Sequence, residues 1–326
     1  MELVRITKES GIPLIGCIAF GIIDRGTNLL QVRPTTVCNL KCEFCSVNAN
    51  NPEVHPANFT VDVNYLLEEI EKVVKFKGVE CEINIDSAGE VGTYPQLIEL
   101  VRGVKGMAGV KRISMQTNGT LLDGEKVFLL QKAGLSQINL SINSLNPEQA
   151  QQLSRTPNYS LEHILGLTKI ISDSGIQLLI APVWIPKIND DEMPKLIELA
   201  KKLNAKIGIQ KYEAYRHSRK VKGAKPVTFW KFYHKLKEME QQYGIGLICT
   251  AEAFGVHKAK RLPTVFEENE KVQLVVKTPG WLNGQMIAVG KDRCVSINDC
   301  RAELGKRVRA KILENKNNIY VAEMAR

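Results

Sequence analysis

The sequence lacks any run of about 18 uncharged apolar residues, the length that a membrane-spanning helix requires. Its apolar N-terminal stretch, Ile12–Ile23, is short, is broken by proline and glycine, and is not followed by a small-residue cleavage site. These absences exclude a membrane span and a secretory signal peptide, so we expect a cytoplasmic protein with no membrane partner.

Cysteine is also scarce, because the 326 residues contain only 8. That number is too small for a disulfide scaffold in a chain of this length. Three of the eight nevertheless lie within the stretch 38–45, which indicates a metal or cluster site in a reducing compartment. The histidines show no metal-ligand spacing among themselves; they are His55, His163, His217, His234 and His257.

Acidic residues are depleted in one part of the chain. The net charge of +9 divides into −2 for residues 1–210, +8 for residues 211–261 and +3 for residues 262–326. Basic charge that gathers in one segment favours a polyanionic partner, and nucleic acid is the natural choice. A solvated basic surface is the alternative.

Between residues 29 and 250, short β-branched apolar runs alternate with amphipathic stretches, which is typical of βα units around a parallel sheet. Thr60 and either Asn189 or Asp190 are the expected N-caps of two helices. The expected strands are Leu29–Arg33, Cys81–Asp86, Arg112–Gln116, Ile138–Ile142, Ile176–Val183 and Ala205–Gln210, followed by a helix over Thr228–Tyr243 and a strand over Gly246–Thr250.

Six such repeats favour an α/β fold built as a partial (β/α)6 TIM-like barrel over the closed eightfold form. We expect an N-terminal extension over residues 1–28, the partial barrel over 29–250 and a basic linker over 251–265. Residues 266–326 predict a small, closed, OB-like all-β barrel, because short alternating runs are separated there by glycine and asparagine turns. The runs are Val272–Lys277, Gln285–Val289, Arg307–Ile312 and Ile319–Ala322.

The most informative residues are Cys38, Cys42 and Cys45, which directly follow the first expected strand. A 4Fe–4S cluster has four irons to ligate, so three thiolates leave one iron open to another molecule. The loop after a barrel strand lies at the face where parallel barrels build their active sites. A structural zinc site completed by His55 is the alternative interpretation.

This segment resembles the radical S-adenosylmethionine (SAM) superfamily, whose hallmark is C-x3-C-x-aromatic-C after the first strand. Cys38, Cys42, Phe44 and Cys45 match it at every defined position. The resemblance implies a 4Fe–4S cluster and SAM as cofactors, cleavage of SAM to a 5′-deoxyadenosyl radical, and an electron donor such as ferredoxin or flavodoxin. It further implies contacts to the cofactor from Phe44 within the motif and from later strand ends, where Ala88 replaces the first glycine of a Gly-Gly-Glu segment. The strand-end residues are Gly89, Glu90, Asn118, Ser141 and Asn143.

The C-terminal segment resembles a TRAM domain, a small RNA-binding barrel found on RNA-modifying enzymes. The resembling residues are Lys271–Lys277, Gly280-Trp281, Gly284, Gly305–Arg309 and Asn318–Ala322. RNA binding by such barrels combines phosphate contacts with stacking on aromatic rings. The expected RNA-binding residues are Trp281, Lys306, Arg307 and Arg309, together with the basic Arg216, Arg219 and Lys220. In the alternative interpretation, Trp281 and Tyr320 are core residues.

A radical SAM core joined to a TRAM domain is similar to the tRNA methylthiotransferases and to an archaeal type of iron–sulfur oxidoreductase. Those transferases carry a second cluster on three more N-terminal cysteines, whereas Cys17 is the sole cysteine before Cys38. We therefore expect an RNA-modifying transferase that acts on a tRNA or rRNA base by radical methylation or a related C–H functionalisation.

Cys249 is the candidate catalytic residue, as the carrier of a transient methyl group, and a small buried hydrophobe is the alternative for it. Three other functions stay open. The chain could be a radical SAM enzyme for a peptide or small molecule, a methylthiotransferase that uses an unusual route, or a non-catalytic RNA-binding protein with structural zinc.

Overall fold

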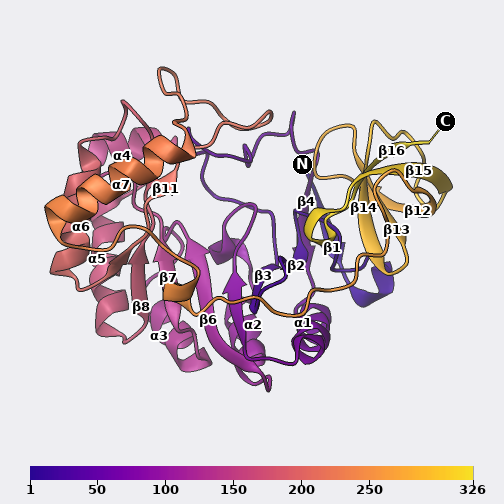
Figure 1. The fold of residues 1–326 in the computed structure, drawn as a ribbon, viewed down its shortest axis with the longest axis horizontal. Coiled ribbons are helices and arrows are strands. Elements are labelled where there is room, and N and C mark those ends of the chain that lie inside the picture. Colours follow the sequence, from indigo (N-terminus) through magenta and orange to yellow (C-terminus); the bar gives the residue numbers. More distant parts are fainter. Residues whose placement is uncertain (326) are drawn as a thin grey trace.

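The computed structural model describes residues 1–325 and contains an α/β sheet unit joined to a small β-barrel (Figure 1). The sheet unit has seven strands, β2 (Gly21–Asp24), β3 (Leu29–Arg33), β5 (Cys81–Ile85), β6 (Val110–Thr117), β7 (Gln137–Leu140), β8 (Gln177–Ile180) and β10 (Lys206–Ile207). Their order is β10-β8-β7-β6-β5-β3-β2, and all pairs are parallel except that of β2 with β3. The α/β class is confirmed.

Helices follow the strands along the chain. They are α1 (Val63–Lys77), α2 (Leu97–Lys105), α3 (Gly124–Ala133), α4 (Pro147–Ser154), α5 (Leu161–Asp173), α6 (Glu192–Lys202) and α7 (Phe229–Tyr243), with 3-10 turns at Lys8–Ser10, Val91–Thr93, Glu252–Phe254 and Lys316–Asn318. Among residues 1–325, no helix combines the length and apolar character needed to traverse a bilayer.

Two expected helix caps are wrong. Thr60 lies in a strand, and Asp62 caps α1 by accepting a hydrogen bond from the Tyr65 amide at 3.0 Å. Helix α6 starts after Asp191, whose side chain makes no capping bond. Asn189 and Asp190 instead accept bonds from the Ile185 amide and the Trp184 indole, because the tight turn before α6 has its own donors to satisfy.

Alternate residues of the central strands divide into an apolar set and a polar set. Ile83 and Ile85 of β5 are buried with the apolar residues of the main core, whereas Glu82 and Asn84 make polar contacts across the sheet. Glu82 pairs with Arg112 at 2.7 Å, and Asn84 accepts a bond from the Ser114 hydroxyl at 3.0 Å. Because strand side chains alternate with a period of two, one face of this sheet is lined with polar groups.

Residues 1–28, expected to form an extension, contribute two strands. β1 (Glu2–Ile6) pairs in parallel with β4 (Ala57–Val61), and β2 closes one edge of the main sheet. The segment after β1 also joins the sheet to the barrel, because Ile15 accepts a bond from the Cys294 amide at 2.8 Å. Gly16 permits this approach: a Cβ there would lie 2.1 Å from the Cys294 carbonyl oxygen.

The C-terminal barrel is closed by five strands in the order β12-β13-β14-β16-β15, as expected. Sequence analysis missed one of them, the short strand that follows a two-residue turn, where Lys291 and Asp292 both have positive φ values of 46° and 55°. That turn geometry favours Asn-Gly, so Lys-Asp gives little signal. The strands are β12 (Lys271–Pro279), β13 (Met286–Gly290), β14 (Arg293–Asn298), β15 (Arg307–Glu314) and β16 (Val321–Met324).

Three other expected strand assignments differ from the structure. Gly246–Thr250 is irregular, because the amides of Leu247 and Ile248 both donate to the Glu240 carboxylate, at 2.7 and 2.8 Å, and take no part in a sheet. The strands expected over Ile176–Val183 and Ala205–Gln210 are each divided in two. A second part of each, β9 (Val183–Trp184) and β11 (Gln210–Lys211), leaves the main sheet and forms a separate parallel pair.

The linker expected over 251–265 is irregular but anchored. Lys77 at the end of α1 donates to Asp24 at 2.6 Å and to the Lys260 carbonyl at 2.7 Å, and both charged side chains are fully buried. The second oxygen of Asp24 accepts a bond from the Leu262 amide. A buried ion pair thus ties the linker to the sheet.

Candidate functional site

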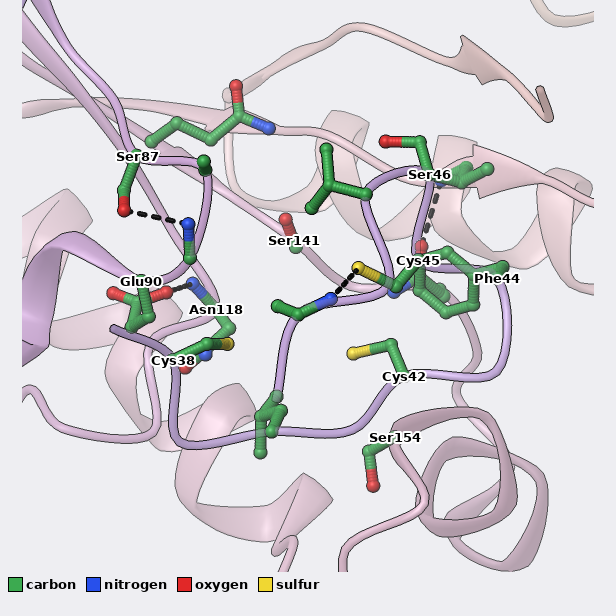
Figure 2. A pocket seen from close by; sticks show the side chains of 18 of the residues that line it. Cys38, Cys42, Phe44, Cys45, Ser46, Ser87, Glu90, Asn118, Ser141 and Ser154 are labelled. Carbon is green, nitrogen blue, oxygen red and sulfur yellow. Dashed lines mark hydrogen bonds between the residues drawn. The ribbon is translucent and has the colours of Figure 1, made fainter. Parts of the chain in front are cut away.

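A cavity of about 420 Å³ lies at the carboxyl ends of the parallel strands, and all three motif cysteines line it (Figure 2). The residues predicted to contact the cofactor line the same cavity; they are Phe44 of the cysteine motif and, at strand ends, Gly89, Glu90, Asn118, Ser141 and Asn143. The structure therefore brings together residues that are more than 100 positions apart in the sequence.

The loop that carries the cysteines is held by its carbonyl groups. Asn50 donates from its amide to the carbonyl oxygens of Cys38 and Leu40, both at 2.7 Å. Arg219 donates to the Cys42 carbonyl at 3.1 Å and to the Ala49 carbonyl, and its own backbone amide donates to Cys45. Neither residue was predicted to hold the loop, since contacts to backbone carbonyls leave no sequence motif. Arg219, expected to bind RNA, is in fact committed to this loop.

The chemistry of the donor set fits an iron–sulfur cluster. Burial raises the pKa of the Cys38 and Cys42 thiols to about 12, so both thiols must lose a proton when they ligate iron. The Ala49 amide donates to the Cys45 sulfur at 3.4 Å, a contact drawn in Figure 2. Such amide contacts to sulfur stabilise thiolates and tune bound clusters.

The alternative of a zinc site completed by His55 is wrong. Its Nδ1 lies 2.9 Å from the Trp281 carbonyl oxygen and its Nε2 lies 2.6 Å from that of Val47. Both ring nitrogens are thus engaged with carbonyl groups, and His55 does not line the cavity that holds the thiols. Within residues 1–325, no three His, Cys, Asp or Glu side chains are arranged to hold a single metal ion.

Gly89 permits a close approach between the loop after β5 and the start of the cysteine loop. A Cβ at this position would lie 2.2 Å from the Val37 carbonyl oxygen and 2.4 Å from that of Thr36. The Glu90 amide donates to the same Val37 carbonyl at 2.8 Å. Position 89 therefore has no room for a side chain, whereas the Ala88 methyl group is buried without such a clash.

Glu90 and Asn118 position the cavity wall through bonds within the protein. Burial raises the pKa of the Glu90 carboxyl, although its oxygens accept three bonds, from Thr117, from the Asn118 amide and from Gly92. The Asn118 side chain donates to Asn39 in the cysteine loop at 3.0 Å. The Glu90 side chain thus fastens the end of β5 to the end of β6, and the Asn118 side chain fastens the end of β6 to the cysteine loop.

The other residues predicted to contact the cofactor differ in whether their side chains already bond to, or pack against, the rest of the protein. The side-chain oxygen Oδ1 of Asn143 accepts a bond from the Val183 amide at 2.8 Å, which fixes the start of β9. Phe44 packs against a small cluster that contains Leu153 and Tyr212. Figure 2 shows Ser141 within the cavity, and its hydroxyl makes no hydrogen bond to residues 1–325, so it can serve a ligand.

Sequence analysis missed several polar side chains of the cavity. Arg33 and Asp86 form a two-bond ion pair, at 3.0 and 3.1 Å, on the ends of β3 and β5. Burial beside Cys42 raises the pKa of the Tyr159 phenol to about 12, so this group keeps its proton at neutral pH and can donate a hydrogen bond. The alternation of polar residues along β6 could have identified Gln116, which continues the row of Arg112 and Ser114.

Cys249, predicted to be catalytic, does not line the cavity. It is solvent-exposed, and its sulfur lies 3.9 Å from the Ile207 carbonyl, at the end of β10. Among residues 1–325, the cysteines that line the cavity are Cys38, Cys42 and Cys45. The cavity therefore offers no further thiol to carry a methyl group.

The predicted RNA-binding residues fall into two sets. Arg216, Lys220, Lys306, Arg307 and Arg309 are exposed, as contacts to a phosphate backbone require. Trp281 stacks on His55, with ring centroids 4.4 Å apart, and packs against the main core between barrel and sheet. Tyr320 is fully buried in the barrel core. The core interpretation is correct for Tyr320, whereas Trp281 is only partly buried, at the edge of the main core.

Comparison with known proteins identifies relatives of the whole chain and of its sheet unit. A sequence profile described as the Radical SAM superfamily matches residues 32–200. An uncharacterised protein of Methanocaldococcus jannaschii is 38% identical over 98% of this chain and 82% of its own length. A GTP 3′,8-cyclase of Aquifex aeolicus is 30% identical over 58% of each chain.

Solved structures agree at the level of the fold. Streptococcus suis SuiB bound to SAM superposes with a TM-score of 0.53 at 16% identity, over 74% of this chain and 52% of SuiB. A radical SAM methyltransferase of Sphaerobacter thermophilus gives a TM-score of 0.52 at 13% identity, over 68% and 65% of the two chains. The chain thus spans little more than half of the cyclase and of SuiB.

Proposed function

The chain belongs to the radical SAM superfamily, and from that premise we propose that it activates a C–H bond of a nucleotide base in RNA. Methylation of the base is one outcome of such a step. The observation that carries the proposal is the cavity itself, where three thiols share a wall with polar strand ends beside the most basic segment of the chain.

A 4Fe–4S cluster and SAM are the cofactors of this superfamily, and Cys38, Cys42 and Cys45 are the residues that would hold the cluster. When bound and reduced, the pair supplies a 5′-deoxyadenosyl radical, which removes hydrogen from unactivated carbon. The chain supplies the rest. Asn50 and Arg219 fix the thiol loop, and Ser141 and Tyr159 offer free hydroxyls to bound ligands. A reductant of the ferredoxin or flavodoxin type would deliver the electron.

The polar lining supports a substrate that is rich in hydrogen-bonding groups. Arg33, Asp86 and Gln116 on three adjacent strands present charged or amide groups to the cavity. A nucleotide base has donors and acceptors around its edge, and an extruded base is read by such groups. We further propose that this sheet is the curved wall of a partial barrel, which would place the polar face inside.

The charge distribution supports RNA. The segment with a balance of +8, residues 211–261, begins at the cavity, because Lys211 and Tyr215 line it. The C-terminal barrel adds the exposed Lys306, Arg307 and Arg309, in keeping with its resemblance to a TRAM domain. A phosphate backbone is the ligand that such gathered cations attract. A folded tRNA or rRNA could contact both basic regions.

A free nucleotide is the second candidate substrate. It is favoured by the 30% identity to a GTP 3′,8-cyclase over 58% of this chain. Such a substrate would use the same cavity and would leave the basic segments without a role.

The test is a comparison of substrates with the reconstituted enzyme. The protein is purified without oxygen, loaded with iron and sulfide, reduced, and incubated with SAM and either unmodified tRNA, rRNA or GTP. Mass spectrometry measures 5′-deoxyadenosine and the digested nucleosides, with Cys42→Ala as the control that cannot cleave SAM. We expect deoxyadenosine together with one RNA nucleoside of altered mass. Conversion of GTP with unaltered RNA would contradict the proposal.

A further inference from the structure

The start of α7 carries an aromatic surface that the cofactor site does not use. Phe229, Trp230 and Tyr233 have 59%, 72% and 44% of their surfaces exposed. Large aromatic rings carry much apolar area and are buried in most proteins. Three exposed rings within five residues therefore indicate a binding surface for another molecule.

These rings are ordered in two adjacent rows of the helix. Phe229 stacks on Tyr233 with ring centroids 6.3 Å apart and planes inclined by 23°, and Trp230 stacks on His234 at 5.1 Å and 7°. Both pairs are four residues apart, the spacing at which helix side chains meet. The result is a surface of flat rings in two stacked pairs rather than a smooth aliphatic patch.

Uncompensated positive charge precedes and follows the rings along the chain. Residues 211–237 contain nine Lys or Arg residues and one acidic residue, Glu213. Within the segment, Lys211 pairs with Glu213, and Lys235 pairs with Glu238 just beyond it. Among residues 1–325 no ion pair neutralises the others that are exposed, which are Arg216, Lys220, Lys222, Lys225, Lys231 and Lys237.

This surface is continuous with the cavity. The Lys211 ammonium lies 4.7 Å from the centroid of the Phe229 ring, and Lys211 itself lines the cavity wall. Tyr215, which is 59% exposed, lines the cavity as well. In Figure 1, α7 lies beside β11 and the loop that joins them. A chain that leaves the cavity past Tyr215 would therefore meet the rings of α7 and the surrounding cations.

We propose that Phe229, Trp230, Tyr233 and the surrounding cations form an RNA-binding surface, here named the α7 platform, for an unpaired stretch of the substrate. Bases stack on the rings, phosphates contact the lysines, and a neighbouring nucleotide enters the cavity. This inference rests on the proposed function and specifies its substrate as single-stranded where it meets the enzyme. Charge complementarity selects a polyanion, and the rings select bases, since an acidic protein surface needs only the cations.

The experiment measures binding of a labelled oligouridine to the SAM-loaded holoenzyme by fluorescence anisotropy. Trp230→Ala should weaken binding by about 5- to 100-fold, because each stacked base contributes that much, while Trp230→Phe should retain most of the affinity. Lys231→Ala should reduce the slope of log affinity against log salt concentration by about one, the effect of losing one phosphate contact. The matched control is Phe128→Ala on α3, where a 55% exposed ring also lies beneath a lysine, and it should bind like the wild type.

Unchanged oligouridine affinity in Trp230→Ala would overturn the platform. Two other results with Trp230→Ala would also overturn it, provided that the variant binds oligouridine normally. Loss of reduction by an acidic flavodoxin would assign the surface to a protein partner, and loss of binding to phosphatidylglycerol vesicles would assign it to a membrane. The nucleoside analysis of the wild type separates the two proposals. Modified RNA with normal binding by Trp230→Ala refutes the platform alone, whereas ring-dependent binding without any modified RNA refutes the proposed reaction alone.

Discussion

At the scale of single residues, the cysteine loop depends on side chains outside its motif. Three thiols can ligate iron only if their loop keeps one shape, and Asn50 and Arg219 fix that shape through four carbonyl groups of residues 38–49. The guanidinium of Arg219 also lies close enough to Cys42 to favour its thiolate form. Such supporting contacts commonly determine how well a metal group is held.

Arg219→Met should therefore lower cluster retention by roughly 10- to 100-fold, because the loop loses its bonds to Cys42 and Ala49. The measurement is iron and sulfide per chain after desalting of the reconstituted protein. Arg102→Met, which replaces an exposed arginine on α2, is the control and should retain the wild-type content. Equal iron in both variants would remove Arg219 from the cluster site.

Gly89→Ala should destabilise the protein by about 1–3 kcal/mol, because the new Cβ would meet the carbonyl oxygens of Val37 and Thr36 and would push the two loops apart. Thermal unfolding and cluster content would both report the change. Gly166→Ala on α5, where nothing lies within 4 Å of the new Cβ, should be neutral or slightly stabilising. If Gly89→Ala unfolded like Gly166→Ala, the close approach would not limit stability.

The Glu192 carboxyl should make the stability of the protein depend on pH. Burial alone would raise the pKa of its carboxyl, but bonds from Lys195, the Leu145 amide and Ser144 together hold that pKa below its usual value. A depressed folded pKa stabilises the protein above the unfolded value of about 4.3, and this stabilisation is lost as pH falls through the folded value. Urea unfolding should show Glu192→Gln less stable than wild type by about 1–3 kcal/mol at pH 7, and the difference should shrink progressively as pH falls below about 4.3 and through the lower folded pKa. A difference independent of pH would contradict this account.

At the scale of elements, the helices and strands are held where they are by a few buried polar links. Lys77 ends α1 inside the protein, where it binds Asp24 of β2 and the carbonyl of Lys260 in the linker. A buried charge whose partner is removed costs far more than an exposed one. The linker therefore behaves as part of the sheet unit.

Lys77→Met should destabilise the protein by about 3–5 kcal/mol, because Asp24 would remain buried and unpaired. Lys75→Met, two positions earlier and 71% exposed in its pair with Glu71, should cost less than about 1 kcal/mol. Chemical denaturation of both variants measures the difference. Similar losses would show that the buried pair contributes no more than an exposed one.

The elements also show what the sequence could predict. Periodicity and composition were sufficient for β3 and α7 and for the existence of the C-terminal barrel, because these depend on local patterns of apolar residues. They failed for Gly246–Thr250, where two amides bind the Glu240 carboxylate of α7, and for β14, which follows a turn whose residues give little sequence signal. Among site residues, the cysteines were predicted by their spacing, whereas Asn50, Tyr159 and the true role of Arg219 depend on tertiary contacts.

At the scale of the whole molecule, the barrel is coupled to the cysteine loop. His55 lies between them, buried, with one ring nitrogen on the Val47 carbonyl and the other on the Trp281 carbonyl. The Asn283 amide adds a bond to Val54 at 2.8 Å. Events at the barrel can thus reach the loop that carries the thiols.

His55→Ala should loosen this junction, because it removes both hydrogen bonds and the stacked ring beside Trp281. We expect faster amide hydrogen exchange in residues 47–55 and 280–285 together with lower cluster retention. His163→Ala, which replaces an exposed histidine on α5, should leave both unchanged. Fast exchange confined to the barrel loop, with normal cluster content, would show that the barrel and the cysteine loop are independent.

The most direct test of the central claim follows hydrogen from the substrate. RNA transcripts are prepared in four versions, each with one nucleotide deuterated on its base and sugar carbons, and are incubated with reduced, cluster-loaded enzyme and SAM. We predict that 5′-deoxyadenosine acquires deuterium from one of the four transcripts, because the radical removes a hydrogen from a nucleotide held in the cavity. Deoxyadenosine that forms without deuterium from any of them would contradict the account.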